Sequence, residues 1–289
     1  MDKISCEHRE SKGLICQKCG VEFTGITYVI LGHEIPQKLC RACSDEIITQ
    51  EKEAEKTKRQ ADITAQRRRW RESCGIEPRY MSEDFSTFDP KRPGNISEIH
   101  RICVNYADQF PVDYDSYRRR TRKAYPSLLL FSTGVWGNGK THLVSSIAHR
   151  ILDRWNGENI VCPVRFICET KIYELIQQTY SYSYDERSKK FSEQEIINQL
   201  ASVKLLIIDD IGKVQRRDMD FVRRIMYDII NKRYDALLPV VFTTNKDTEG
   251  LRDYLGNAEE EASLDRIIGM TGGEMWQVKG KSYRRDKKA

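Results

Sequence analysis

The chain has 289 residues, nine cysteines and a formal net charge of +5. This length leaves room for one large domain of about 200 residues and a smaller one. No stretch approaches the ~18 apolar residues of a membrane helix, and the first ten residues lack the apolar core of a signal peptide, so we expect a soluble, cytoplasmic protein without membrane contact. In that compartment cysteines are thiols or metal ligands rather than disulfides.

Two Cys-x-x-Cys pairs lie in the first fifty residues; their members are Cys16, Cys19, Cys40 and Cys43. The spacing is typical of four thiolates that close on one tetrahedral metal, and zinc is the expected ion. Such a closed site replaces the hydrophobic core that so short a segment cannot build. We therefore predict a zinc-binding module over residues 1–48, of zinc-ribbon or treble-clef type; the alternative is four unrelated thiols.

Other details of this module stay open at the sequence level. Residues 27–31 are apolar and predict a short strand, with turns at Gly20 and Gly32. Cys6 and His8 lie just upstream and could replace one ligand, but they are too few for a second complete site. A module of this size could bind a protein or a nucleic acid.

Residues 45–72 contain neither Gly nor Pro and are rich in Glu, Lys, Gln, Ala and Arg, which predicts a mainly exposed helix. Gly75 and Pro78 end it, so we expect a helical linker over residues 49–75 and a larger domain over 76–289. Trp70, in its basic end, could stack on a base or pack against that domain, and packing is the commoner role for a single tryptophan.

The positive charge is concentrated in two clusters, Arg67–Arg69 with Arg71, and Arg118–Arg120 with Arg122 and Lys123. Such clusters favour an anionic partner, most plausibly nucleic acid. A solvated helix face carries the same pattern.

The segment PSLLLFSTGVWGNGKTHL, residues 126–143, joins an apolar strand (128–131) to a helix (141–154) through a glycine-rich turn. It matches the pattern G-x-x-x-x-G-K-[ST], in which glycines let backbone N–H groups surround phosphate oxygens at the positive end of a helix. Lys140 would reach the β- and γ-phosphates and Thr141 would ligate magnesium. We predict an ATP or GTP site whose other binding residues are Gly134, Gly137, Asn138, Gly139 and His142.

Beyond this loop strand and helix alternate, which predicts a parallel sheet covered on both faces with the ligand at the carboxyl edge of its strands. The expected strands are 164–168, 205–208 and 239–243, and the expected helices are 171–179 and 219–234.

Polar residues follow two of these strands. In LLIIDDIG, residues 205–212, we assign Asp209 to Mg²⁺ and Asp210 to the attacking water. In TTN, residues 243–245, Asn245 could hydrogen-bond the water or the γ-phosphate. Acidic and polar turns after strands are the structural alternative.

Together these residues resemble an AAA+ ATPase, and more closely the DnaC/IstB group of bacterial and phage helicase loaders and transposition helpers. The resemblance covers residues 76–289 and is carried in order by IEPRYMSEDFSTF, GVWGNGKTHL, LLIIDDIG, IINKRY, TTN, DRI and GKSYR. It implies an α/β AAA+ P-loop core that assembles as a homo-oligomer on ATP. It further implies that Asn245 senses the γ-phosphate and that Arg266 is an arginine finger completing a neighbouring subunit's site.

Arg266 could equally be an ordinary surface arginine at a helix end. Only 23 residues follow it, so we expect the helical lid of many AAA+ proteins to be reduced or absent. Arg284 or Arg285 could approach the nucleotide or belong to a basic tail. The aromatic residues Tyr80, Phe85 and Phe88 occupy the region that approaches adenine in this group, or else they pack in the core.

The leading functional expectation is an ATP-dependent helicase loader that assembles on single-stranded DNA and holds a replicative helicase through its N-terminal module. A transposition helper ATPase acting on target DNA shares every core motif and is the first alternative. A zinc-containing, nucleotide-switched DNA-binding regulator is another, although adjacent Asp209 and Asp210 favour hydrolysis. A small-molecule P-loop kinase would need a substrate pocket and mobile lid for which the sequence gives no sign.

Overall fold

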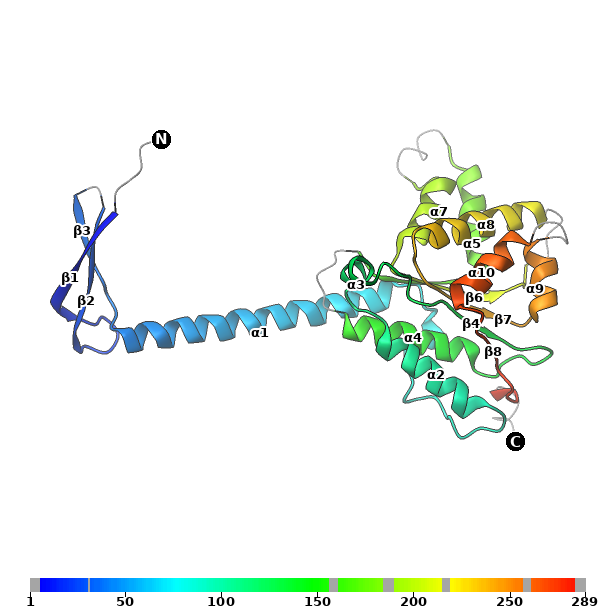
Figure 1. Cartoon of the computed structure of the whole chain (residues 1–289), viewed down its shortest axis with the longest axis horizontal. Coiled ribbons are helices and arrows are strands. Elements are labelled where there is room, and N and C mark those ends of the chain that lie inside the picture. Colours follow the sequence, from blue (N-terminus) through cyan, green and yellow to red (C-terminus); the bar gives the residue numbers. More distant parts are fainter. Residues whose placement is uncertain are drawn as a thin grey trace. The chain divides into compact units, whose positions relative to one another are not determined.

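The computed structural model describes residues 6–30, 32–155, 161–183, 190–214, 219–256 and 261–283. The chain divides into two compact units, Met1–Thr64 and Ala65–Ala289 (Figure 1). The division falls inside helix α1 (Arg41–Ser73), so the predicted linker belongs to one continuous helix. The module boundaries predicted at residues 48 and 75 stay predictions.

The first unit contains a three-stranded antiparallel sheet in the order β1 (Cys6–Ile15), β2 (Glu22–Ile30) and β3 (His33–Pro36). The strand predicted over residues 27–31 is the end of β2, and Leu31 lies outside the described residues. The sequence did not reveal β1 because CEHRESKGLI is mostly polar and shows no apolar alternation. Strand pairing and the cysteine cluster described below, rather than a large apolar core, therefore organise this unit.

The second unit is built on a five-stranded parallel sheet in the order β5-β6-β7-β4-β8. Its strands are β4 (Leu128–Phe131), β5 (Val164–Cys168), β6 (Leu205–Ile211), β7 (Val240–Thr244) and β8 (Met275–Gln277). The first four were predicted, since each is a buried apolar run. Strand β8 was missed because it is three half-buried residues long. All carboxyl ends meet at one edge, where the predicted site residues cluster.

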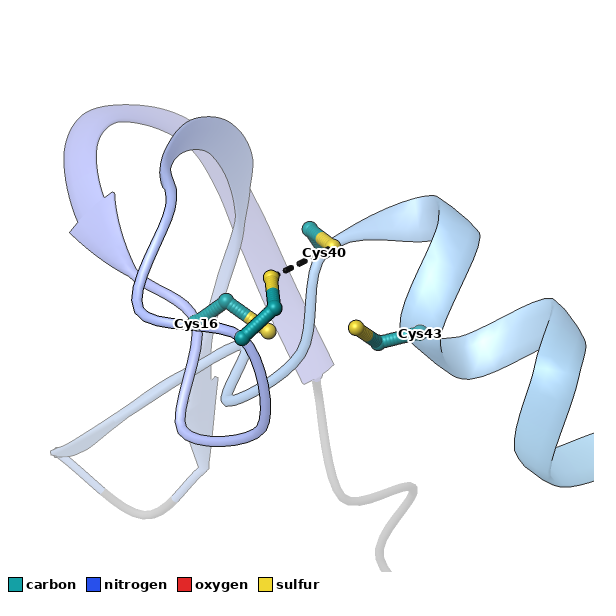
Figure 2. Close-up of side chains that lie close together, drawn as sticks. Cys16, Cys40 and Cys43 are labelled. Carbon is teal, nitrogen blue, oxygen red and sulfur yellow. Dashed lines mark hydrogen bonds between the residues drawn. The ribbon is translucent and has the colours of Figure 1, made fainter.

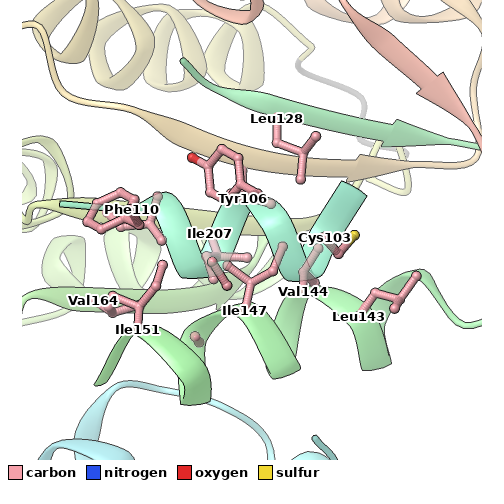
Figure 3. Packing of buried hydrophobic residues seen from close by; sticks show 14 of the residues in the cluster. Cys103, Tyr106, Phe110, Leu128, Leu143, Val144, Ile147, Ile151, Val164 and Ile207 are labelled. Atoms are coloured by element: carbon pink, nitrogen blue, oxygen red, sulfur yellow. The ribbon is translucent and has the colours of Figure 1, made fainter. Parts of the chain in front are cut away.

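Helices cover both faces of this sheet. They are α2 (Ile96–Gln109), α3 (Tyr114–Thr121), α4 (Lys140–Arg154), α5 (Glu169–Tyr180), α7 (Glu193–Ser202), α8 (Met219–Asp235), α9 (Thr248–Leu255) and α10 (Ala262–Thr271), with a 3-10 turn η1 (Pro78–Tyr80). Successive strand residues alternate between the two core clusters: Leu128 and Leu130 pack with α2 and α4, whereas Leu129 packs with α5, α7 and α8. Figure 3 shows part of the first cluster, between α2, α4 and the sheet. The predicted α/β architecture is confirmed.

The carboxyl-terminal end of α1 belongs to this core. Trp70 is 2% exposed and packs in the first cluster, so packing and not base stacking is its role. Arg67 donates to the carbonyl of Trp155 at 2.7 Å, and Arg71 forms an ion pair with Asp153. Two arginines of the first basic cluster therefore hold the end of α4, which leaves the cluster around Arg118 as the stronger candidate for an anionic partner.

No helix in the described ranges has the length and apolar character needed to span a bilayer. After α10 the described residues contain strand β8 and extended chain, with no helical bundle. The reduced or absent lid stays a prediction.

Candidate functional site

The glycine-rich turn after β4 has the backbone that phosphate binding requires. Gly134, Gly137 and Gly139 have φ of 70°, 77° and 103°, in the left-handed region that favours glycine. A Cβ on Gly139 would lie 2.8 Å from the ring of Phe88, so glycine is also needed there for space. Helix α4 begins at Lys140, and its first N–H groups face the turn. The loop can therefore surround an anion at a helix N-terminus.

Lys140 lies buried beneath this loop. Its Nζ donates to Asn245 Oδ1 at 2.8 Å, to Ser132 Oγ at 2.5 Å and to Asn138 Oδ1 at 3.2 Å. Burial lowers the pKa of Lys140 to about 8, although Asp210 and Asp209 act in the opposite direction. The nearest acceptors are neutral oxygens, so an incoming phosphate would supply the anionic partner that this ammonium lacks. Ser132 was not predicted, because its only signal is its place in the loop.

A second group of oxygens lies beside the loop at the end of β6. Asp209 is 5% exposed and accepts hydrogen bonds from Thr141 Oγ1 at 3.0 Å and Thr243 Oγ1 at 2.5 Å. Burial, and then the neighbouring charge of Asp210, raises the pKa of Asp209 to about 6. A divalent cation would relieve this cost, and hydroxyl and carboxylate oxygens are the ligands that Mg²⁺ prefers. Thr141 and Asp209 are thus suited to hold Mg²⁺, and their assignment to the metal stays a prediction.

Asp210, the next residue along β6, lines a cavity. Its φ is 62°, and the β6–β7 register shifts between Ile208 and Ile211, which turns this residue out of the regular ladder. The carboxylate accepts from Asn245 Nδ2 at 3.3 Å and forms an ion pair with Lys213. Asn245 therefore joins Asp210 on one side to Lys140 on the other, and the structure brings the three residues together.

The cavity has a volume of about 720 Å³, within the range of small-molecule sites. The phosphate loop, Asp210, Lys213 and Asn245 form one part of its wall, and residues 79–92 contribute another. Tyr80 and Phe88 line it, whereas Phe85 packs edge-to-face against His100 at 5.6 Å. Phe88 also packs in the first core cluster, so packing applies to Phe85 and Phe88, while approach of Tyr80 and Phe88 to a base stays a prediction.

His142 joins the two parts of this wall. Its Nδ1 lies 3.1 Å from Glu83 Oε2, and its Nε2 lies 2.8 Å from the carbonyl oxygen of Asp84. The ring also packs edge-to-face against Phe88 at 5.1 Å. His142 lines the cavity, and it also fixes the preceding segment against α4. Gly134, the first residue of the motif, shapes the turn without lining the cavity.

Arg266 lies away from this cavity, on α10. Its guanidinium stacks on the rings of Tyr227 and Tyr234, at 5.2 and 5.8 Å, and Nη1 donates to the carbonyl of Ala262 at 3.0 Å. It does not line the site of its own chain. A catalytic role for Arg266 therefore requires a second subunit. Arg284 and Arg285 lie outside the described residues.

The first unit holds a separate cluster of four thiols (Figure 2). The sulfurs of Cys16, Cys19, Cys40 and Cys43 lie within 4.8 Å of one another, and those of Cys19 and Cys40 are 3.7 Å apart. Tetrahedral zinc–thiolate bonds of about 2.3 Å would separate two sulfurs by about 3.8 Å, so the cluster fits zinc. Cys43 lies in the first turn of α1, which brings the second pair to a helix N-terminus.

The four thiols perturb one another in opposite directions. The backbone N–H of Cys40 lowers the pKa of Cys16 to about 6, and hydrogen bonding to Cys19 raises the pKa of Cys43 to about 12. Four thiolates this close require a cation. His8 lies on exposed β1 and is not part of the cluster, and the side chain of Cys6 is outside the described set.

Comparison with known proteins agrees with this architecture. The family model of IstB-like ATP binding proteins matches residues 128–289. The replicative helicase loader DnaC of Escherichia coli K12 is 24% identical over 204 residues, which cover 71% of this chain and 69% of that protein. DnaC of Buchnera aphidicola subsp. Acyrthosiphon pisum is 24% identical over 202 residues, covering 70% and 69%. A crystal structure of the DnaC helicase loader aligns with a TM-score of 0.51 at 20% identity, over 70% of this chain and 100% of that one. The chain therefore belongs to the IstB-like ATP-binding family of AAA+ proteins and is distantly related to the DnaC helicase loaders.

Proposed function

We propose that this protein is an ATP-hydrolysing helicase loader that acts in DNA replication. One observation carries the proposal: Lys140, Asn245 and Asp210 form a connected set beside the Thr141–Asp209 pair, at the wall of a cavity of about 720 Å³. Phosphate binding, metal binding and water activation therefore have separate groups within one site.

In this mechanism the phosphate loop and Lys140 bind the triphosphate. Thr141 and Asp209 would hold Mg²⁺, which would supply neutralisation of the phosphate charge. Once Lys140 donates to phosphate, the Asn245 oxygen loses one of its two donors and retains the Ser132 hydroxyl at 3.2 Å, which leaves the amide freer to turn toward the γ-phosphate. Asp210 accepts a proton from the attacking water. The water oxygen forms a bond to the γ-phosphorus, and the bond between the γ-phosphorus and the oxygen that leaves with ADP breaks.

A neighbouring subunit would complete the site with Arg266. The arginine is held on the tyrosines of its own α8, and it cannot serve the cavity that its own chain forms. An arginine finger accelerates phosphoryl transfer by about 10³-fold or more. Hydrolysis should therefore be slow in the monomer and should require ATP-dependent assembly.

We assign a replicative helicase as the partner because of the similarity to DnaC proteins and because of the features of the N-terminal module. The DnaC relatives are named replicative helicase loaders, and we infer that this chain also binds a replicative helicase and delivers it to DNA. We assign helicase binding to residues 1–48, where zinc would hold the four-cysteine cluster and where Ile26, Tyr28 and Ile35 are exposed on the sheet. Residues 49–75 connect this module to the ATPase of residues 76–289, and the carboxyl-terminal end of this connecting helix packs in the ATPase core.

The test is capture of a hexameric replicative helicase by the full-length chain. The Cys40→Ser variant should no longer capture the helicase, because it lacks one thiol of the cluster, but its affinity for ATP should be unchanged. Reversing the charge of Arg118–Arg120 should lower the affinity for single-stranded DNA and make that affinity less dependent on salt concentration. Helicase capture should be unchanged. The two variants thus separate the partners.

The family description also supports a second candidate, a transposition helper of the IstB type. Failure to capture helicase, together with preference for duplex DNA and binding to a transposase, would select it. A nucleotide-switched DNA-binding regulator would bind ATP without measurable turnover.

A further inference from the structure

A buried carboxylate lies behind the proposed site. Glu169 is the first residue of α5 and is 0% exposed. It follows Cys168, which pairs with Asp209 in the parallel ladder between β5 and β6. The carboxylate therefore lies at the same sheet edge as the site, although it is not among the residues that line the cavity.

Three donors compensate for the burial of this carboxylate. The N–H of Gly212 donates to Oε2 at 2.9 Å, while the hydroxyls of Tyr254 and Tyr173 donate to Oε1 at 2.9 and 3.1 Å. Burial raises the pKa of Glu169, and these hydrogen bonds partly oppose that effect. The Gly212 N–H can only donate, and both hydroxyls also donate here, so a carboxylate with two acceptor oxygens suits this position.

The partners of Glu169 come from both polar strand ends of the site. Gly212 is two residues after Asp210, and Tyr254 lies on α9, the helix that follows Asn245. The first segment has left-handed backbone at both Asp210 (φ 62°) and Gly212 (φ 94°). Such a conformation persists only where its surroundings hold it in place.

We propose that Glu169 is a positioning residue that fixes the segment of Asp210 relative to that of Asn245, and so controls the rate of ATP hydrolysis without contributing to ATP affinity. The proposal rests on the proposed function, in which Asp210 activates water. Glu169 acts through Gly212 on one side and Tyr254 on the other.

Glu169→Gln tests the proposal in the full-length chain. The amide keeps the shape but offers one acceptor oxygen. If that oxygen keeps the Gly212 N–H, the –NH2 group faces the two tyrosine hydroxyls and their hydrogen bonds must reverse direction. We expect kcat to fall about 10- to 100-fold, as for other residues that orient a reactive group. The dissociation constant for ATP should stay within about twofold of the wild type.

Glu193→Gln is the matched control. Glu193 is also the first residue of a helix, α7, and also accepts from a tyrosine, Tyr180, and from Arg224, but it does not line the cavity. The kcat of the Glu193→Gln variant should equal that of the wild type. Tyr254→Phe removes one donor and keeps the bond to Gly212, so it should lower kcat by a smaller factor than Glu169→Gln.

Wild-type kcat in a folded Glu169→Gln variant would overturn the inference, as would a loss of ATP affinity as large as the loss of kcat. If Glu169→Gln does not fold, unchanged kcat in Tyr254→Phe would overturn it instead. A wild-type chain that binds ATP without hydrolysing it would reject the proposed function itself, which is a distinguishable result.

Discussion

ATP binding at alkaline pH should be accompanied by proton uptake at Lys140. Burial lowers the pKa of this ammonium to about 8, so about half of the free chains carry it neutral at pH 8. A bound triphosphate favours the charged form. The uptake should therefore be about half a proton per ATP at pH 8, about 0.9 at pH 9 and about 0.1 at pH 7.

Isothermal titration calorimetry in buffers of different ionisation enthalpy measures this number directly. Lys213 is the matched control, because it also lines the cavity but its pKa is raised by hydrogen bonding and charge interaction with Asp210, which outweigh burial. It is already charged over this range, so Lys213→Met should retain most of the uptake. Binding heats that do not depend on the buffer at pH 9 would refute the argument for Lys140.

Three further substitutions test separate parts of the account. Asp210→Asn should bind ATP with normal affinity and hydrolyse it at least about 10²-fold more slowly, measured by phosphate release; loss of binding would assign Asp210 to the metal or the fold. Elemental analysis should find one zinc per wild-type chain and less in Cys40→Ser, and a wild-type chain without zinc would eliminate the metal module. Arg266→Ala should bind ATP but turn over slowly, and mixing it with Asp210→Asn should restore part of the rate; strictly additive rates would argue against a shared site.

The sequence was most informative where residue chemistry and spacing are both restrictive. The glycines, Lys140 and Thr141 of the phosphate loop could be predicted, because few residue types permit that backbone and that ligand. The two Cys-x-x-Cys pairs likewise predicted one cluster. The buried strands were recognisable as apolar runs ending in polar residues.

Features that depend on long-range contacts could not be predicted. Ser132 and Glu169 are ordinary polar residues until folding brings them to Lys140 and Gly212. Arg67 and Arg71 were interpreted as part of a nucleic-acid cluster, but they bind the end of α4, 82 or more residues away in the chain. Charge alone does not distinguish arginines that face a partner from arginines that bind their own chain.

Steady-state ATP hydrolysis by the wild-type chain and by Lys140→Ala, over a range of protein concentrations, tests the central claim most directly. The account predicts hydrolysis by the wild type, with a rate per chain that rises with concentration as subunits assemble. It predicts no hydrolysis by Lys140→Ala. The thermal midpoint of this variant should stay close to that of the wild type because the hydrogen-bond partners of Lys140 are polar residues of the site and not the apolar core. Equal rates in the two proteins would show that the cavity beside Lys140 is not the site of hydrolysis.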